Sequence, residues 1–484
     1  MKVLISDPLA PEGVAILREA GLEVVEQTDL SPDELREALR DCDALIVRSG
    51  TQVTAYALAE AERLKVIGRA GAGVDNIDLD SATRRGILVM NTPGGNTVSA
   101  CELTLAMMLA LARRLPQATA RVKAGEWPRR EFRGTELQGK RLGIIGLGRI
   151  GTEVARRAQA FGMDIVAFDP FVTQELARRL EVKLVQLDEL LATSDIITIH
   201  TPGSDDTDGL IGAEAFAAMK DGVLLVNCAR GSIIDETALA DALRSGKVAG
   251  AALDVFQSEP PGDSPLLAFD QVIATPHVGA TTVEAQTNVA TQIARQVLDV
   301  LAGKPPQNAL NAPAVDPELL DLLGPYIDLA ERLGRLIVQL TLGRIAQLTV
   351  TYRGEMTEHD VRPLTTAILK GILERALTTP VNYVNAPVIA AERGIEVNVV
   401  GSTELEDFAN LITVEARIGG CTTAVAGTLF SRNAPRIVRV DGYHVDAAPE
   451  GHLLITHNHD EPGVIAHVSS VLAERGVNIA DMTC

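Results

Sequence analysis

The sequence predicts an α/β protein with two doubly wound, parallel-sheet lobes, followed by an α+β region and a short final segment. Up to about residue 300, short runs rich in Val, Ile and Leu alternate with helical patterns, which is typical of parallel sheets covered by helices on both faces. A chain of 484 residues also exceeds what one hydrophobic core usually holds. With 46% hydrophobic and 22% charged residues, the composition supports several folded domains without disulfides.

The first lobe is expected over residues 1–98, with a completing segment at about 287–308. Its expected strands are KVLIS, ALIVRS, KVIGRA and ILVMN, each separated from the next by a helical pattern. This order favours a parallel sheet, because parallel neighbours need a crossover connection.

The second lobe is expected over residues 99–286, where a stronger strand rhythm follows Gly139. The runs are RLGIIGLG, DIVAFD, IITIHTP, GVLLVNCA, GAALDVF and QVIATPH. Before them, Ser99 and Glu102 form a capping-box pattern that predicts the start of the helix LTLAMMLALARRL. Apolar residues lie nearly all round this helix, so we expect it to be buried between the lobes or against another subunit.

The rest of the chain is expected to form a linker and two further domains. Residues 303–317 are rich in Pro and Asn and are interpreted as the linker. Residues 309–448 mix a helix with strands such as IAQLTVTYRG, and no catalytic constellation is found there. Residues 451–484 read as strand, helix and strand, which is too small for an independent core. We therefore expect the chain to be cut inside its last domain.

Charge and cysteine content restrict the partners and the compartment. A formal net charge of -20 repels nucleic acid and anionic lipid, so neither is expected as a partner. The five cysteines are odd in number and lack CxxC spacing, which favours a reducing compartment and gives no metal site. No segment has the apolar length to span a membrane, so a soluble, cytoplasmic protein is expected.

A dinucleotide site is predicted where Gly146-Leu-Gly148-Arg-Ile-Gly151 stands between the strand RLGII and a helix. The first glycine permits a tight turn, the second lets the backbone approach a pyrophosphate, and the third allows close packing of the helix on the strand. Asp169 ends the next strand, at the spacing where a carboxylate binds the adenosine ribose and repels a 2′-phosphate. The pattern predicts NAD as the cofactor; the alternative is a structural glycine turn with a surface Asp.

Two histidines of the lobes, His200 and His277, are candidates for an acid or base. Each follows an apolar strand, where catalytic residues are usual in such sheets. His277, in the loop PHVGAT, is preferred; the alternative is a structural histidine. Glu259 precedes a double proline and is a candidate to hydrogen-bond and orient the His277 ring.

Arg230 follows the strand GVLLVNCA and precedes a glycine turn. A guanidinium at a strand end suits bidentate binding of a substrate carboxylate. The alternative is an arginine paired to Asp235 or Glu236.

The motifs GLGRIG, NCARGSIIDE, AALDVFQSEP and TPHVGAT together resemble those of the D-isomer-specific 2-hydroxyacid dehydrogenases. The resemblance implies that Arg230, Glu259 and His277 are catalytic. The runs GRAGAGVDNID and NTPGGNTVSACELT and the long tail resemble an extended branch of this family, which oxidises D-3-phosphoglycerate with NAD at the start of L-serine synthesis.

The resemblance also implies a role for each region of the chain and for individual residues. The first lobe binds substrate, the second is a Rossmann-like NAD domain, residues 309–448 form an intervening domain, and residues 451–484 begin a ferredoxin-like ACT domain. NAD is expected against a set of second-lobe residues that lie in the glycine motif or follow a strand: Gly146, Gly148, Arg149, Ile150, Gly151, Asp169, Thr201, Cys228, Ala229, Arg230, Asp254, His277, Gly279 and Ala280.

Substrate and effector residues follow from the same resemblance. The substrate is expected at Arg48, Arg69 and Asn96, and at Arg129 on an arm donated by a neighbouring subunit of a homodimer or homotetramer. A serine effector is expected at three residues of the final segment, Asn458, Asp460 and Asn478, and an anionic effector near Arg436 of the intervening domain.

Two other functions fit parts of this pattern. One is a glyoxylate, hydroxypyruvate or D-lactate reductase of the same fold, which Arg48 and Arg69 disfavour because only a phosphorylated substrate needs a phosphate clamp. The other is a non-enzymatic, NAD-binding corepressor, which the acidic composition and the ACT-like tail disfavour.

Overall fold

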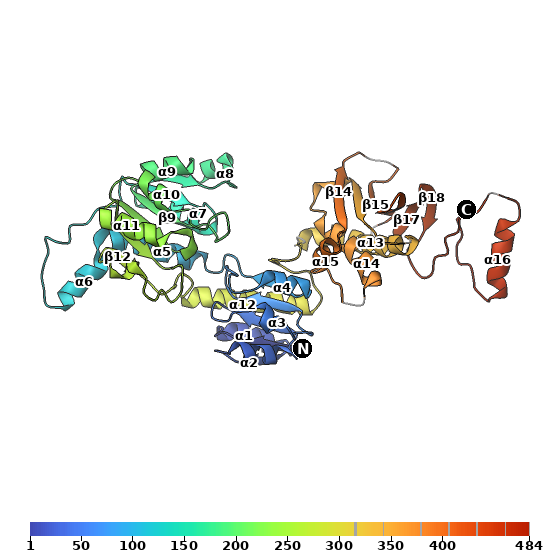
Figure 1. The fold of residues 1–484 in the computed structure, drawn as a ribbon, viewed down its shortest axis with the longest axis horizontal. Coiled ribbons are helices and arrows are strands. Elements are labelled where there is room, and N and C mark those ends of the chain that lie inside the picture. The colour runs from blue at the N-terminus through green and yellow to red at the C-terminus, as the bar shows by residue number, and fades with distance from the viewer. Residues whose placement is uncertain are drawn as a thin grey trace.

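The computed structural model describes residues 1–313, 317–341, 343–377, 380–404, 407–431, 434–459 and 461–483, with the side chains of 317–321 left out. The chain forms three sheets in an elongated molecule, and the N-terminal sheet lies between the other two (Figure 1). No helix in these ranges has both the length and the apolar character needed to cross a membrane.

The first lobe is a five-stranded parallel sheet in the order β2-β1-β3-β4-β5. Its strands are β1 Lys2–Ile5, β2 Glu23–Glu26, β3 Ala44–Val47, β4 Val66–Arg69 and β5 Leu88–Asn91; its helices are α1 Pro11–Glu19, α2 Pro32–Leu39, α3 Ala55–Leu58 and α4 Leu79–Arg84. The strand β2, half exposed at the sheet edge, carries no strong apolar signal and is not predicted.

A helix from beyond the second lobe completes the first core. The helix α12, Val283–Leu301, packs on α1 and β4, and Figure 1 shows it among the helices of the first lobe. Gly13 and Gly68 allow this contact, because a Cβ at either position would lie 2.7 Å from atoms of α12.

The second lobe is a seven-stranded parallel sheet in the order β12-β11-β10-β9-β6-β7-β8. Its strands are β6 Arg141–Ile145, β7 Asp164–Phe168, β8 Lys183–Leu184, β9 Ile196–Ile199, β10 Val223–Asn227, β11 Val248–Leu253 and β12 Val272–Ala274. Its helices are α5 Thr97–Arg113, α6 Leu115–Lys123, α7 Arg149–Ala160, α8 Gln174–Arg179, α9 Leu187–Thr193, α10 Ala213–Ala218 and α11 Glu236–Ser245, with short 3-10 turns at η1 Gly231–Ile233 and η2 Pro265–Ala268. The two parallel lobes confirm the predicted fold class.

The predicted N-cap of α5, Ser99, is wrong by three residues. The helix begins at Thr97, and its N-cap, Asn96, makes no side-chain capping bond. Ser99 is buried inside the first turn, because α5 turns toward the core, where it packs on α7, β10 and β11. A residue inside the first turn cannot cap it, since a cap must stand before the first helical residue.

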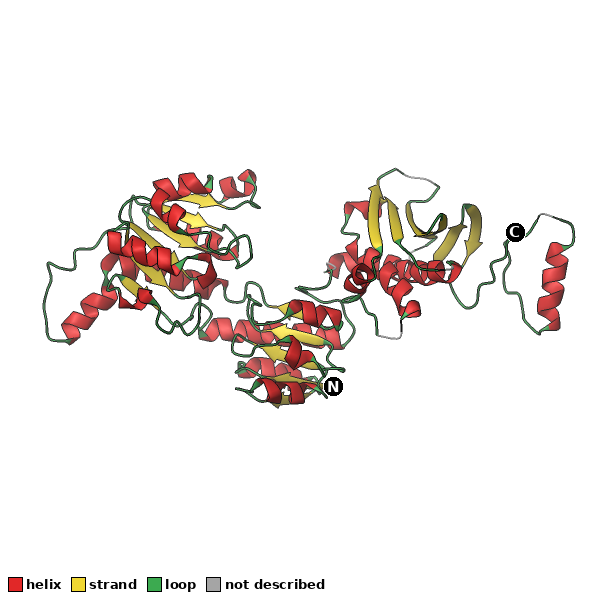
Figure 2. Ribbon diagram, viewed as in Figure 1, coloured by secondary structure: helices red, strands yellow, loops and turns green. Residues whose placement is uncertain are grey.

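The third domain is an α+β unit, as predicted, with a six-stranded sheet in the order β14-β13-β15-β16-β17-β18. The strands are β13 Gln347–Gly354, β14 Glu396–Ser402, β15 Asn410–Ile418, β16 Cys421–Leu429, β17 Pro435–Val440 and β18 Tyr443–Ala447. The helices of this domain are α13 Pro317–Leu340, α14 Arg362–Ala376 and α15 Ala386–Glu392, and it has one short 3-10 turn, η3 Glu355–Glu358, among its described residues. Residues of β13 alternate between buried and half-buried, because α13 and α14 cover one face of the sheet (Figure 2).

Part of the segment interpreted as a linker is docked on the first lobe. Leu310 donates its amide to Val89 of β5, and the Asn311 side chain accepts from the Val89 amide and donates to the Ile87 carbonyl. The third domain is held to the same edge by Asn382, which donates to the Gly86 carbonyl. The Pro- and Asn-rich composition reflects these specific contacts of the described residues 303–313 as well as a turn-rich path.

The final segment contains the helix α16, Val464–Glu474, which Figure 1 shows beyond the third domain on an extended tether. The two strands predicted beside this helix are not formed within the described residues 452–459 and 461–483. None of these residues is buried. A strand needs a hydrogen-bonding neighbour and an apolar face to cover, and this segment meets neither in the described chain.

Candidate active site

The glycine turn between β6 and α7 has the geometry of a dinucleotide cradle. Gly146 has φ +93°, and a Cβ there would lie 2.8 Å from the His200 carbonyl. Gly148 faces open space, since no described heavy atom lies within 4 Å of its would-be Cβ. A Cβ at Gly151 would lie 2.1 Å from the Gly146 carbonyl oxygen, so helix and turn touch there. The three positions therefore supply a tight turn, an open approach and close packing.

Asp169 stands beside this turn at the end of β7. Its Oδ2 accepts from the Leu147 amide at 2.9 Å, and its Oδ1 accepts from the Phe171 amide at 2.9 Å. The carboxylate is half exposed, which leaves lone pairs for a ribose hydroxyl. Thr201, after β9, has a buried Oγ1 with no hydrogen-bond partner among the described residues. An unpaired buried hydroxyl needs a partner, so the open cradle, the carboxylate and this hydroxyl fit a bound NAD.

The glycine turn gives a matched pair of substitutions. Gly151→Ala is expected to lower the free energy of unfolding by about 1–3 kcal/mol, because its methyl group meets backbone. Gly148→Ala, at φ -74° with open space around it, is expected to keep wild-type stability and lose NAD affinity. Urea unfolding and calorimetric titration with NAD separate the two effects. Equal loss of stability in both variants contradicts this division of roles.

The other residues predicted to meet NAD lie at the same carboxyl edge of the second sheet. Arg149 and Ile150 open α7, Cys228 and Ala229 follow β10, and the pair Gly279 and Ala280 follows β12. Burial raises the pKa of the Cys228 thiol to about 12, and its Sγ lies 3.5 Å from the Met107 Sδ. The Cys228 thiol therefore stays protonated; it contributes apolar surface to the predicted NAD site and does not act as a nucleophile.

Asp254, after β11, organises the loop that carries His277. Its side chain is 1% exposed; Oδ1 accepts from Thr275 and from the Val278 amide, and Oδ2 accepts from the Gly279 amide. The His277 amide donates to the Asp254 carbonyl at 2.9 Å. These bonds hold His277 at φ +51°, a conformation that is uncommon for a residue with a side chain and is found at functional sites.

Glu259 contacts the His277 ring, as the sequence predicts. The His277 Nδ1 and the Glu259 Oε2 are 2.6 Å apart. The Glu259 Oε1 accepts from the Phe256 amide at 3.2 Å, which holds the carboxylate in place. A carboxylate on Nδ1 selects the tautomer with the proton on that nitrogen and leaves Nε2 as a free base.

His200 lies in a different environment and is set aside as the base. Its Nε2 is 3.0 Å from the Thr198 Oγ1, and its Nδ1 is buried without a partner among the described residues. Burial lowers the pKa of His200 to about 3, so the ring stays neutral at every physiological pH.

This buried ring makes the protein sensitive to acid. The pKa of His200 is lower in the folded chain than the value near 6.5 expected for an unfolded histidine, so the unfolded state binds more protons between the two values. The free energy of unfolding should therefore fall by up to about 1.4 kcal/mol per pH unit from this residue as the pH drops through that window. In His200→Asn this component is expected to vanish. Urea unfolding of both proteins at several pH values from 7.5 to 4.5 measures it; parallel pH profiles contradict it.

Arg230 is paired across the two lobes, and the alternative pairing with Asp235 or Glu236 is wrong. Its Nε lies 3.0 Å from the Oδ2 of Asp75, in the loop after β4 of the first lobe, and its Nη1 donates to the Ala229 carbonyl at 2.7 Å. Asp235 is unsuited because it caps α11 through the amides of Thr237 and Ala238. The guanidinium thus reaches the inter-lobe crevice.

Two predicted substrate arginines belong to the same electrostatic cluster. Arg69 lies over Gly71, whose would-be Cβ is 2.0 Å from the Arg69 Nη1. Burial lowers the pKa of Arg69 to about 10, and the charges of Arg230 and Arg48 act in the same direction. Its Nε is buried without a partner in the described chain. Arg69 and Arg230, from two lobes, thus lie against one loop, at Gly71 and Gly73, and the buried Arg69 can accept an anionic partner.

The remaining predicted residues lie apart or lie outside the described residues. Asn96 stands at the start of α5, and Arg129 is exposed on the arm that follows α6. Asn458 and Asn478 are exposed in the final segment, where Asp460 lies outside the described residues. The Arg436 Nε lies 3.4 Å from the Asp446 Oδ1 in the third domain.

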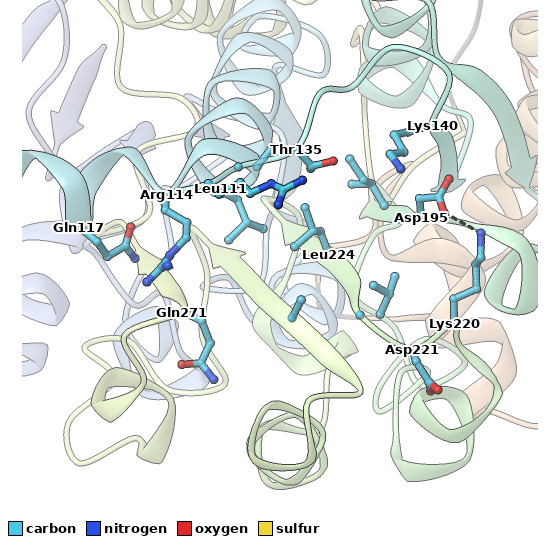
Figure 3. A pocket seen from close by; sticks show the side chains of 17 residues that line it. Leu111, Arg114, Gln117, Thr135, Lys140, Asp195, Lys220, Asp221, Leu224 and Gln271 are labelled. Carbon is cyan, nitrogen blue, oxygen red and sulfur yellow. Dashed lines mark hydrogen bonds and ion pairs between the residues drawn. The ribbon is translucent and has the colours of Figure 1, made fainter. Parts of the chain in front are cut away.

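A cavity of about 450 Å³ lies at the opposite edge of the second sheet (Figure 3). It is lined at the amino ends of β9 and β10 and by Arg114 after α5, and Lys220 pairs there with Asp195 at 2.6 Å. None of the predicted site residues lines it. The amino and carboxyl ends of parallel strands lie at opposite edges, so this cavity is separate from the predicted catalytic residues.

Sequence reasoning missed Asp75 and the glycines around it. The run GRAGAGVDNID places two glycines, Gly71 and Gly73, and then Asp75 after an apolar strand, which signals backbone that must approach another group closely. The Asn91 amide supports this loop by donating to the Ala72 carbonyl at 2.5 Å.

Comparisons with known proteins agree with this geometry. Three family models match: the D-isomer specific 2-hydroxyacid dehydrogenase NAD binding domain at residues 105–279, the D-3-phosphoglycerate dehydrogenase intervening domain at 322–441 and the ACT domain at 452–484. A D-3-phosphoglycerate dehydrogenase of Archaeoglobus fulgidus is 45% identical over 100% of this chain and 92% of its own length. One of Methanocaldococcus jannaschii is 46% identical with the same coverage.

Solved structures match the two lobes. The TT0316 protein of Thermus thermophilus is 37% identical with a TM-score of 0.60, covering 64% of this chain and 100% of that one. A D-lactate dehydrogenase of Aquifex aeolicus, complexed with NAD and lactic acid, is 32% identical with a TM-score of 0.56, covering 63% and 96%.

The two parallel lobes, the glycine cradle and the histidine paired with a glutamate define an NAD-dependent dehydrogenase of the D-isomer specific 2-hydroxyacid class. Within this class, the relatives that match the full chain and the matching intervening-domain model both belong to D-3-phosphoglycerate dehydrogenases. The chain belongs to the D-3-phosphoglycerate dehydrogenase family.

Proposed function

We propose that this enzyme oxidises D-3-phosphoglycerate to 3-phosphohydroxypyruvate with NAD, the first step of L-serine biosynthesis. The observation that carries the proposal is that Arg69 of the first lobe and Arg230 of the second lie against the same loop, at Gly71 and Gly73, where the charge of Arg48 also acts. On a chain with a net charge of -20, such a cluster attracts a substrate that carries both a phosphate and a carboxylate.

His277 is the general base of the proposed reaction. Its Nε2 takes the proton of the C2 hydroxyl, while Glu259 on Nδ1 stabilises the imidazolium that forms. Arg230 binds the carboxylate next to C2 and orients that carbon. Bound NAD supplies the acceptor for the hydride that leaves C2.

The chain's own residues hold the two reactants. Gly146, Gly148 and Gly151 receive the pyrophosphate, and Asp169 binds the ribose. The other predicted NAD residues contact the cofactor from the loops after β9, β10, β11 and β12: Thr201, Cys228, Ala229, Arg230, Asp254, His277, Gly279 and Ala280. Arg48, Arg69 and Asn96 bind the substrate in the first lobe. A carboxylate at Asp169 repels a 2′-phosphate, which favours NAD over NADP.

Regulation and assembly complete the proposal. The ACT match supports binding of an amino acid, and we assign serine to Asn458, Asp460 and Asn478. We place Arg129 in contact with a neighbouring subunit of a homodimer or homotetramer. We assign the enzyme to the cytoplasm. The domain boundaries are 1–98 with 287–308, 99–286, 309–448 and 451–484.

Initial rates test the proposed function. D-3-phosphoglycerate should be oxidised with NAD far better than unphosphorylated D-glycerate, because only the first fills the arginine cluster. Equal rates with the two substrates indicate a reductase of the glyoxylate or D-lactate kind. The absence of turnover with any hydroxy acid indicates a non-enzymatic role. The same assay with and without serine tests the effector.

A further inference from the structure

The ion pair between Arg230 and Asp75 joins the two lobes at the point where the substrate carboxylate is proposed to bind. We propose that Asp75 is a positioning residue: it pairs with Arg230 while the site is free of substrate, and the substrate carboxylate displaces it. Its carboxylate occupies the Nε side of the guanidinium at 3.0 Å. This inference rests on the proposed role of Arg230.

The geometry leaves the substrate little room beside Asp75. The Arg230 Nη1 already donates to the Ala229 carbonyl, and the Nη2 lies against Gly73, whose would-be Cβ would be 1.7 Å away. That same Cβ position lies 3.0 Å from the Asp75 Oδ2, so arginine, glycine and aspartate are in contact. A carboxylate that binds the Nε and Nη2 side must displace Asp75.

Asp75 differs from the other carboxylate that acts on this cluster. The buried Asp7 accepts the amides of Arg48 and Thr51 at 2.5 and 3.2 Å, so it is part of the loop framework. Asp75 has a side chain that is 64% exposed, and Arg230 is its one hydrogen-bond partner among the described residues. An exposed pair with one bond is weak and exchanges readily. Asp75 is therefore the carboxylate that can leave.

The charges explain why such a group is useful. The charge of Arg230 opposes the protonation of Arg69, whereas the charge of Asp75 favours it. Without substrate, Asp75 offsets part of the repulsion between the guanidinium groups. A ligand must bring negative charge to replace that compensation, so Asp75 competes with any anion that binds Arg230.

Substitution of Asp75 tests the inference. In Asp75→Asn the competing charge is removed, and we expect KM for D-3-phosphoglycerate and the inhibition constant of sulfate each to fall roughly two- to five-fold, as for loss of an exposed ion pair. We expect kcat to stay within about two-fold of the wild-type value, because the C2 hydroxyl of the substrate still faces His277. Asp75→Glu should behave like the wild type, since it restores the charge. Asp80→Asn, an exposed carboxylate of α4 in the same lobe, is the matched control for net charge.

Ionic strength and direct binding make the result decisive. The difference between Asp75→Asn and the wild type should shrink as KCl rises from about 0.05 to 0.5 M, because salt screens an exposed pair. A higher KM in Asp75→Asn, or an unchanged sulfate constant at low salt, overturns the inference. If no hydroxy acid is turned over, the proposed function fails, and calorimetric titration of sulfate into the three variants still decides the role of Asp75.

Discussion

Replacing His277 with alanine is expected to lower kcat by roughly 100- to 10,000-fold while NAD affinity stays at the wild-type value. The size is that of a lost general base. The Asp254 bonds that hold the loop come from backbone amides of residues 277–279, so they survive removal of the ring. Stopped-flow measurement of NADH formation, together with calorimetric titration of NAD, checks both parts.

Variants of the partner of His277 and of the second histidine provide the controls for this prediction. Glu259→Gln keeps the size of the side chain but loses the charge on the His277 Nδ1, so we expect a smaller fall in kcat and a shifted limb of the pH–rate profile. His200→Asn should leave kcat close to the wild type. If kcat falls as far in His200→Asn as in His277→Ala, the assignment of His277 as the general base is contradicted.

Replacing Arg230 with alanine is expected to lower kcat/KM for D-3-phosphoglycerate by roughly 30- to 5,000-fold. Loss of one partner of a desolvated charge pair costs about 2–5 kcal/mol. In this protein the loss is compounded by Asp75, whose charge then faces the substrate carboxylate with no arginine between them. Arg230→Lys should recover little of the activity, because a point charge cannot replace the planar fork.

A double variant shows whether the two residues are coupled. Asp75→Asn in the Arg230→Ala background should raise kcat/KM by more than the roughly two- to five-fold expected when Arg230 is present, whereas independent residues would give the same factor in both backgrounds. Unchanged kcat/KM in Arg230→Ala would remove Arg230 from the carboxylate site. Steady-state kinetics of the four proteins in one buffer supply the comparison.

Much of the site was predictable because local chemistry constrains it. The runs RLGII and DIVAFD have the apolar composition of buried parallel strands, and they form β6 and β7. The spacing of Gly146, Gly148 and Gly151 follows from the path of one turn, so a single stretch of sequence contains it. Pairing of Glu259 with His277 was predictable because both follow strands that end at the same sheet edge.

Other features depended on contacts between distant segments. The start of α5 moved to Thr97 because tertiary packing buries Ser99. The strands expected around α16 lack a neighbouring strand in the described chain. The preference for His277 over His200 as the proposed base rests on burial of the His200 ring and on the Glu259 carboxylate beside His277.

The sequence by itself determined the two parallel lobes, the glycine cradle and the identity of the candidate acid, base and cation. Those features arise from periodicity and from residue types within a few turns of chain. The tertiary structure alone decided that Arg230 is held by Asp75, 155 residues away, and that Asp254 shapes the His277 loop. Ion pairs and loop hydrogen bonds depend on distances in space: docking of one lobe on the other sets the Arg230–Asp75 distance, and packing of β11 beside β12 within the second lobe brings Asp254 to the His277 loop.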